Sequence, residues 1–221
     1  MPAEIHNRIK KRKLMTMVNT EPEARRLEQL WGGDFGNAYV DRNREARAHR
    51  EPFWTKIVTE TAPQRVLEVG CNLGANLSWI AAQIGPENVT GVDVNLNALK
   101  ELSRAVPGVN LQWSPGRELP FRDRWFDLTF TMGVLIHQPE STLPLVMAEI
   151  VRCSRKYVLC GEYYSEQTVE VPYRDQEGAL FKRDYGRIYQ ELFPELQLRT
   201  TGFLSKAEGW DDVTYWLFEK P

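Results

Sequence analysis

The chain has few cysteines and lacks any long apolar run. Its only cysteines are Cys71, Cys153 and Cys160, and they show neither CxxC nor metal-ligand spacing. This pattern argues against a disulfide scaffold and against a bound metal, and it favours reduced core thiols in a cytoplasmic protein. Because no apolar stretch approaches the ~20 residues that a membrane-spanning helix needs, we expect no membrane partner.

The chain also lacks an excess of positive charge. It has 28 Lys and Arg against 30 Asp and Glu, a net charge of −2, so no basic field would gather nucleic acid. The exception is the basic run from Asn7 to Lys13, which no apolar segment follows as a signal peptide would require. We expect residues 1–19 to form a flexible basic tail, with a nucleic-acid or membrane-surface contact as the alternative. The sequence does not define the oligomeric state.

What the chain does contain is an alternation of short apolar runs and helical patterns. The runs are residues 65–70, 88–94, 109–113, 126–136 and 156–164, and helical patterns at 76–82, 96–105 and 141–153 separate most of them. Such alternation predicts an α/β fold with a mostly parallel sheet covered on both faces.

Both ends of the chain depart from this alternation. After a helical stretch at 183–196, the strand-like runs 196–204 and 211–220 are joined by a short polar connection, which predicts a terminal antiparallel hairpin. With this hairpin, the expected sheet is Rossmann-like and seven-stranded. Upstream, helices at 20–30 and 44–60 indicate an N-terminal helical segment, residues 20–62, ahead of a core at 63–221.

A glycine loop follows the first expected strand. A dinucleotide-binding loop aligned on Gly70 would need glycines at positions 72 and 75, where this chain has Asn72 and Ala75. The spacing fits Glu68-x-Gly70-x-Asn72-x-Gly74 better, since asparagine can adopt the left-handed conformation that glycine usually supplies. About twenty residues further on, Asp93 ends the second strand, where a carboxylate can accept hydrogen bonds from ribose hydroxyls.

Four segments extend this pattern: "LEQLWGGDFGNAYVDRN", "LEVGCNLGANL", "FTMGVLIHQPEST", and "GEYYSEQTVEVPYRDQEGALFKRDY" with the closing "DDVTYWLFEK". On these segments the chain resembles class I S-adenosylmethionine (SAM)-dependent methyltransferases, and among them the pseudaminic acid biosynthesis-associated methylase family, over about residues 27 to 220. The resemblance implies SAM as cofactor and a polar small-molecule substrate. The methyl acceptor would be a hydroxyl or amine, with a sugar or nucleotide-sugar of a nonulosonic-acid-type pathway as the candidate.

The resemblance also implies which residues hold the cofactor. In related enzymes the chain before the first strand folds over SAM, so the N-terminal segment is expected to be a lid, with Gly32, Gly33 and Gly36 allowing close backbone approach. The expected cofactor-binding residues are Phe35, Tyr39, Arg42, Glu68, Gly70, Asn72, Gly74, Asp93, Val94, Ser114 and Met132.

Candidate catalytic residues follow the fourth and fifth strands. His137 is the expected general base, with helix capping or packing as its alternative role, and Glu162 and Tyr163 are the further candidates. The long link 163–185 is expected to bind substrate, because links of this length are often functional. Its expected substrate-binding residues are Tyr164, Tyr173, Arg174, Lys182 and Arg183, and a solvated charge cluster is the competing interpretation of its cations.

Other functions remain open from the sequence alone. An N- or O-methyltransferase of a natural-product pathway would carry the same motifs. An NAD-dependent oxidoreductase shares the acidic residue after the second strand, but the missing glycines and the terminal hairpin argue against it. A non-catalytic SAM-binding module would bind the cofactor without turnover.

Overall fold

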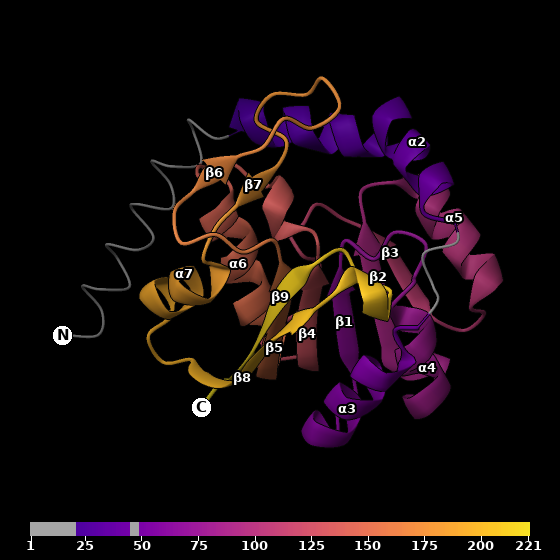
Figure 1. Ribbon diagram of the computed structural model, residues 1–221. Helices are drawn as coiled ribbons and strands as arrows, with labels where there is room; N and C mark the ends of the chain where they lie inside the picture. The colour runs from indigo at the N-terminus through magenta and orange to yellow at the C-terminus, as the bar shows by residue number, and fades with distance from the viewer. Residues whose placement is uncertain (1–20, 45–48) are drawn as a thin grey trace.

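The computed structural model describes residues 21–44 and 49–221, arranged as helices on both faces of one sheet (Figure 1). The expected tail at 1–19, the residue Thr20 and part of the expected helix at 44–60 lie outside the described residues.

The main sheet has seven strands in the order β3-β2-β1-β4-β5-β9-β8. The first five strands pair in parallel, while β9 runs antiparallel to both β5 and β8. The expected Rossmann-like sheet with a terminal antiparallel hairpin is therefore confirmed. The strands are β1 Val66–Val69, β2 Val89–Asp93, β3 Asn110–Trp113, β4 Phe126–Met132, β5 Ser154–Glu162, β8 Gln197–Leu204 and β9 Val213–Glu219.

The helices lie where the apolar periodicity predicts them, apart from one. They are α2 Asp34–Arg42, α3 Glu51–Thr61, α4 Leu77–Ile84, α5 Leu96–Ala105, α6 Leu143–Cys153 and α7 Tyr185–Leu192, with short 3-10 turns at η1 Pro86–Asn88, η2 Leu135–His137 and η3 Lys206–Glu208. Residues 21–32 are also helical. The exception is α2, which occupies the glycine-rich segment where no helix was expected.

Two further elements differ from the expected pattern. The apolar run at 126–136 is not one strand, because β4 ends at Met132 and the chain then turns through η2. Gly133, with a φ of +68°, makes that change of direction. The link 163–185 also contains a small two-stranded sheet of β6 Val169–Glu170 and β7 Phe181–Lys182.

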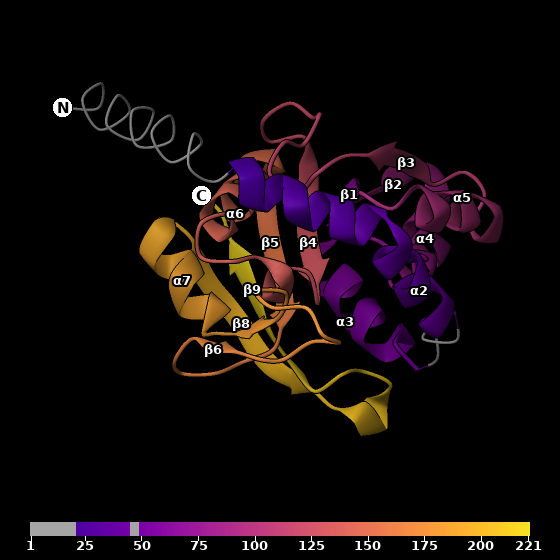
Figure 2. The same ribbon diagram turned by 90° about the horizontal axis from the view of Figure 1, so that it is seen from above.

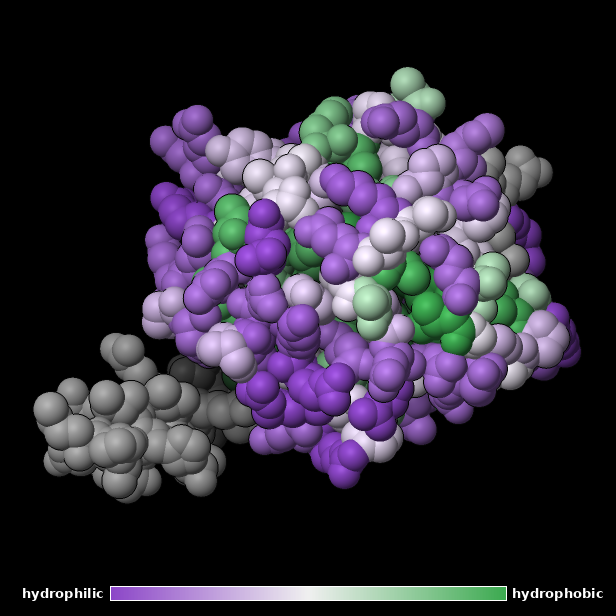
Figure 3. All heavy atoms as spheres, turned by 90° about the horizontal axis from the view of Figure 1, so that it is seen from below, coloured by the Kyte–Doolittle hydropathy of each residue, from purple (hydrophilic) through white to green (hydrophobic). Residues whose placement is uncertain are grey.

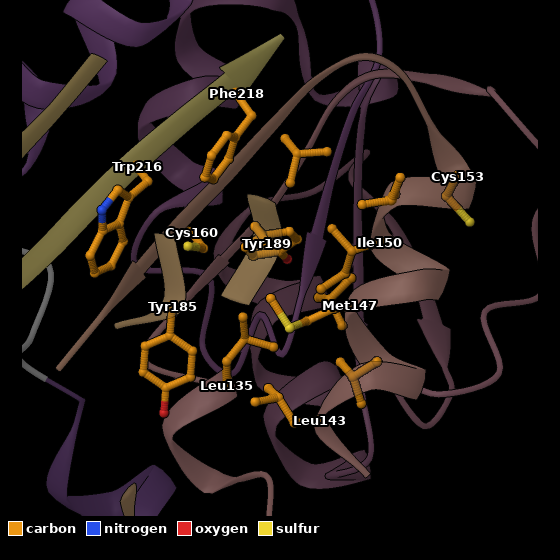
Figure 4. Packing of buried hydrophobic residues seen from close by; sticks show 14 of the residues in the cluster. Leu135, Leu143, Met147, Ile150, Cys153, Cys160, Tyr185, Tyr189, Trp216 and Phe218 are labelled. Carbon is orange, nitrogen blue, oxygen red and sulfur yellow. The ribbon is translucent and has the colours of Figure 1, made fainter. Parts of the chain in front are cut away.

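An apolar cluster covers each face of the main sheet. One cluster joins the sheet to α6 and α7 through side chains such as Met147, Ile150, Tyr185 and Tyr189, which Figure 4 shows packed together with Cys160 and Phe218. The other joins it to α3, α4 and α5, with Trp54 and Phe130 completely buried. All three cysteines are free and buried. Burial on both faces explains the nearly continuous apolar strands.

The helices at 21–32 and α2 cross the carboxyl ends of the central strands, as Figures 1 and 2 show from the side and from above. The opposite side of the molecule is mostly hydrophilic, with apolar areas between the hydrophilic residues (Figure 3). Within residues 21–44 and 49–221, no helix is both long and apolar enough to cross a membrane.

Candidate active site

A cavity of about 410 Å³ lies at the carboxyl ends of the parallel strands. Its floor comes from the loops after β1, β2 and β4, and its roof from residues 24–43. Ligands of open α/β sheets bind at this edge, so the cavity is the candidate active site.

The loop after β1 has the backbone geometry that its sequence predicts. Gly70, Asn72 and Gly74 have φ values of +78°, +45° and +71°, so Asn72 takes the expected left-handed conformation. A Cβ added at Gly70 would lie 2.5 Å from the Val134 side chain, and one at Gly74 would lie 2.2 Å from Leu102. Gly70 and Asn72 line the cavity, whereas Gly74 packs behind it.

Asp93 connects this loop to the start of α5. Its carboxylate accepts hydrogen bonds from the backbone N–H groups of Asn72 and Asn95, both at 2.8 Å. Burial raises the pKa of Asp93, and these amide hydrogen bonds act in the opposite direction. The carboxylate lies at the cavity wall, where the sequence predicts a ribose ligand.

Glu68 belongs to a buried polar network that the sequence did not reveal in full. One carboxylate oxygen accepts a hydrogen bond from Asn76 Nδ2 at 2.7 Å, and Asn76 Oδ1 accepts from Arg50 and Trp54 at 3.0 and 3.2 Å. Burial raises the pKa of Glu68 to about 8, although the hydrogen bond from Asn76 and the charge of Arg50 oppose this. Glu68, Arg50 and Asn76 all line the cavity.

The roof is fixed to the core by close backbone packing and one asparagine. Asn95 Nδ2 donates to the Trp31 carbonyl at 3.0 Å and to Asn37 Oδ1 at 3.1 Å. A Cβ at Gly36 would lie 1.7 Å from the Trp31 carbonyl oxygen, and one at Gly32 would lie 3.0 Å from the Val94 carbonyl oxygen. The glycines thus permit the close approach that the sequence predicts.

The aromatic side chains of the roof divide between the cavity and its support. Trp31 and Tyr39 line the cavity with their rings 5.4 Å apart. Phe35 does not line it and instead packs against Trp31 and Tyr173. Arg42 lines the cavity and is exposed, with its guanidinium 5.8 Å from the Tyr39 ring.

His137 ends the turn after β4 and is buried against the roof. Its Nδ1 lies 2.6 Å from the Ala179 carbonyl oxygen, and its ring lies 4.4 Å from Trp31 and 5.4 Å from Tyr173. Burial lowers the pKa of His137 to about 4, so the ring is neutral at physiological pH. Since a carbonyl can only accept, Nδ1 carries the proton and Nε2 is left as a hydrogen-bond acceptor.

Glu162 does not line the cavity. Its side chain is fully buried, and its carboxylate accepts hydrogen bonds from the backbone N–H groups of Val134 at 3.3 Å and Ile136 at 3.1 Å. Burial raises the pKa of Glu162 to about 7 against the effect of these backbone donors. The prediction that Glu162 meets the substrate as a base therefore does not match its position.

The link 163–185 places only part of its expected set at the cavity. Tyr163, Tyr173 and Arg174 line it. Tyr164 and Lys182 are exposed outside it, and Arg183 is buried, with Nη1 donating to the Gln138 carbonyl at 2.8 Å. The predicted cluster of substrate-gripping cations is thus reduced at the cavity to Arg174.

The remaining predicted cofactor residues all line the cavity: Val94, Ser114 and Met132. The Ser114 hydroxyl donates to the Glu118 carbonyl at 2.7 Å, so it stabilises its own loop. A ligand at this wall would therefore contact the loop backbone and the neighbouring residues Pro115 and Gly116.

The sequence analysis missed the loop between β8 and β9. This loop supplies Trp210 and Asp211 to the cavity, and Arg50 stacks on the Trp210 ring at 4.5 Å. A topological signal was available: because β9 is antiparallel to β5, the residues before it must lie at the carboxyl end of β5. Arg117 was also missed; it holds the 21–32 helix in place through Glu28 at 2.7 Å.

Comparison with known proteins agrees with this fold. Residues 66–156 match a family model described as "Methyltransferase domain". The phthiotriol/phenolphthiotriol dimycocerosates methyltransferase 1 of Mycobacterium ulcerans (strain Agy99) is 31% identical over 98 residues, 43% of this chain and 35% of that protein. The chain spans only 34–41% of the length of the phthiotriol methyltransferases it matches.

Solved structures extend the likeness over most of the chain. The 1,6-didemethyltoxoflavin-N1-methyltransferase of Burkholderia thailandensis, with bound 1,6-didemethyltoxoflavin and S-adenosylhomocysteine (SAH), has a TM-score of 0.68 at 17% identity over 85% of each chain. The magnesium protoporphyrin IX methyltransferase of Synechocystis PCC 6803 with bound SAH has a TM-score of 0.66 at 12% identity, over 88% of this chain and 98% of that one. The fold is that of class I methyltransferases. Within it, residues 66–156 match the methyltransferase domain.

Proposed function

We propose that this chain is a SAM-dependent methyltransferase acting on a hydroxyl or amine of a polar small molecule. The observation that carries the proposal is a group of buried polar atoms without hydrogen-bond partners around the cavity. Among the described residues these include Trp31 Nε1, Glu68 Oε2 and Asn72 Oδ1, and all three residues line the cavity. Buried polar atoms are rarely left unsatisfied, so these atoms point to a ligand that carries both donors and acceptors.

The residues present fit SAM. Gly70 lines the cavity with a positive φ of +78° that favours glycine, and Asp93 offers a carboxylate suited to ribose hydroxyls. The unpaired oxygen of Glu68 suits the ammonium of the methionine part, and the guanidinium of Arg42 suits its carboxylate. Tyr39 and Trp31 would cover this part from above.

The chemistry would be an in-line displacement, in which SAM supplies an activated methyl group. The contribution of the chain is mainly to align the acceptor and exclude water, and the aromatic roof serves both purposes. His137 Nε2 would accept the proton that the acceptor loses as the new bond forms. Its hydrogen bond from Nδ1 to Ala179 keeps Nε2 free for this and stabilises the cationic ring that results.

The acceptor side of the cavity suits a polar substrate. Tyr39, Tyr163 and Tyr173 bring aromatic rings and phenol groups to it, and Asp211 and Arg174 add charges of both signs. Aromatic rings can stack on the C–H faces of a sugar while hydroxyls and charges bind its polar groups. A sugar or nucleotide-sugar, as in the pseudaminic acid-associated family, fits this lining of rings, phenol groups and charges.

Titration with SAH tests the cofactor proposal directly. We expect wild-type protein to bind SAH and not NAD. The variant Asp93→Ala should lose about 10- to 100-fold in SAH affinity, since a charged hydrogen bond contributes about 1.5–3 kcal/mol. Asp41→Ala on the exposed side of α2 is the matched control. Binding of NAD in preference to SAH would refute the proposal and favour an oxidoreductase.

The substrate proposal needs a separate experiment. The protein would be incubated with SAM and a panel of unmethylated nucleotide-sugars, sugar acids and fatty acids, and methylated products would be detected by mass spectrometry. Methylation confined to the fatty acids would contradict a polar acceptor. SAH binding with no turnover on any compound would favour a non-catalytic SAM-binding module.

A further inference from the structure

The turn that carries His137 is held by groups from outside it. Residues 133–138 connect β4 to the loop before α6, and His137 ends the short η2 segment within them. The turn bonds to itself only through the amides of His137 and Gln138, which donate to Val134 and Leu135 carbonyls. A single 3-10 turn of this kind has little stability of its own.

Glu162 holds the first half of the turn. One carboxylate oxygen accepts a hydrogen bond from the amide of Val134 and the other from the amide of Ile136, and the amide of Leu135 between them also acts to lower the pKa of Glu162. The side chain has no exposed surface and lies at the end of β5, beside β4 in the sheet. Because both oxygens are used by the turn, Glu162 fixes its position relative to the sheet.

Arg183 holds the other end. Its Nη1 donates to the carbonyl of Gln138, the residue after His137, at 2.8 Å, and its guanidinium lies 4.2 Å from the Phe181 ring. Arg183 is 3% exposed, and in the described part of the chain its guanidinium bonds to neutral groups, the Gln138 carbonyl and the Tyr185 hydroxyl at 3.4 Å, and not to a carboxylate. A buried cation without a carboxylate depends on the hydrogen bonds that it makes to neutral groups.

We propose that Glu162 and Arg183 are positioning residues that hold the His137 turn from its two ends. We call this pair the turn clamp. The inference rests on the proposed function, because His137 matters as a base only if the chain transfers methyl groups. The clamp keeps His137 Nδ1 within hydrogen-bonding distance of the Ala179 carbonyl, and so keeps Nε2 directed to its acceptor.

Each side of the clamp can be weakened by a substitution of similar shape. In Glu162→Gln, the side-chain NH₂ replaces one accepting oxygen, so at least one hydrogen bond from the backbone of the turn is lost. In Arg183→Met, the stem of the side chain is kept but the donor to Gln138 is removed. Arg183→Lys keeps the charge and can still donate one hydrogen bond.

The test is long-range ¹H–¹⁵N NMR of the histidine rings in the full chain without ligand. The chain has only His6, His49 and His137, and His137→Gln identifies the third signal. We expect one neutral tautomer with the proton on Nδ1 in the wild type and in Arg183→Lys. In Glu162→Gln and Arg183→Met we expect the His137 ring to exchange between its two neutral tautomers. The ¹⁵N chemical shifts of its two ring nitrogens should then move toward the average for those tautomers.

An unchanged His137 signal in either Glu162→Gln or Arg183→Met would overturn the two-sided clamp, even if the variant had become less stable to heat. The exposed residues Glu166 and Arg187 provide matched controls as Glu166→Gln and Arg187→Met, which should leave the signal as it is. SAH titration of the same samples separates the two ideas. Failure of the wild type to bind SAH would refute the proposed function, whereas the NMR result tests the clamp.

Discussion

The chemistry of His137 and Glu162 follows from their burial and from the backbone groups that they contact. Both side chains lack contact with bulk water, and this favours the neutral form of each. For His137 the result is a free Nε2 at neutral pH. For Glu162 the result is a carboxyl whose pKa of about 7 lies within the physiological range.

Replacement of His137 by Gln should reduce turnover by about 100-fold or more, the usual contribution of a general base. SAH affinity should remain, because His137 is not among the residues proposed to hold the cofactor. Since the pKa of His137 is lowered to about 4, the wild-type rate should show no imidazole titration near the ordinary value of 6.5. Steady-state kinetics over a range of pH measures both quantities. Equal turnover in the variant would mean that alignment alone suffices.

The raised pKa of Glu162 predicts a pH-dependent stability difference. In the folded chain its pKa is about 7, above the ordinary 4.5, so between these values the folded state binds more protons than the unfolded state. Stability from this group therefore falls as pH rises through that range. Glu162→Gln removes the effect. Its free energy of unfolding should therefore rise relative to that of the wild type between about pH 5 and pH 8, by on the order of 1–3 kcal/mol, and its melting temperature should rise with it.

Thermal melts of both proteins at the two pH values measure this difference. Glu68 has a pKa of about 8, so its contribution to stability also falls as pH rises. This contribution is the same in both proteins and therefore cancels when they are compared. A constant difference between the two proteins at both pH values would mean that Glu162 is ionised throughout.

At the scale of elements, α2 is the part of the roof that depends most on one residue. Gly36 is buried where α2 meets the Trp31 carbonyl and Asn95 Nδ2, and a Cβ there would be 1.7 and 2.9 Å from them. These contacts are mostly with backbone, which cannot move aside as a flexible side chain could. The helix must therefore shift if this position gains a side chain.

We expect Gly36→Ala to cost about 1–3 kcal/mol of stability, as overpacked substitutions do. SAH affinity should also fall, by about 10-fold, because Trp31 and Tyr39 move with the helix. Ala38→Ser, on the exposed side of the same helix, is the control. Chemical denaturation and SAH titration measure the two effects. Unchanged SAH affinity in a destabilised Gly36→Ala would mean that α2 is only a connection and not part of the site.

How much could be predicted from the sequence differs between elements. The five parallel strands and α5 could be predicted from apolar runs and from helical periodicity. These patterns arise because the strands and the helix pack together in one sheet that helices cover. The helix α2 was missed because Gly36 within it and Gly32 and Gly33 before it lower helix propensity, and tertiary contact through Gly36 and Asn95 outweighs that preference. Sheet β6–β7 was missed because strands of two residues have no periodicity to detect.

Site residues divide in the same way. Gly70, Asn72 and Asp93 were predictable because a loop of fixed spacing after a strand determines where they lie. Glu162 and Arg183 were expected to touch substrate because their residue types suit it, but sequence does not show that backbone amides and a carbonyl already occupy them. Trp210 and Asp211 depend on the strand direction of β9, which is a property of the whole sheet.

At the scale of the whole molecule, stability depends on apolar clusters on both faces of one sheet. Phe130 in β4 is fully buried and lies 4.6 Å from the Trp54 ring, which in turn bonds to Asn76 in the site. The same cluster thus supports both the fold and the polar network under the cavity.

Phe130→Ala should lower the free energy of unfolding by about 3–5 kcal/mol, the usual cost of deleting a buried aromatic ring. Phe203→Ala, where the ring is 58% exposed, should change it by about 0.5 kcal/mol or less. Urea denaturation followed by fluorescence measures both. A small effect at Phe130 would show that the cluster can close around the gap.

The order of the cavity wall along the chain separates part of the acceptor side from the donor side. The matched domain, residues 66–156, contributes Gly70 and Asp93, which are proposed to hold SAM, and the base His137. The chain before it contributes Trp31, Tyr39 and Arg42, which are proposed to cover the methionine part of SAM. Side chains that are proposed to meet the acceptor follow the matched domain, at Tyr163, Tyr173, Arg174 and Asp211. Transplanting residues 163–213 between proteins of this fold should therefore change the preferred acceptor on the substrate panel and leave SAH affinity as it is.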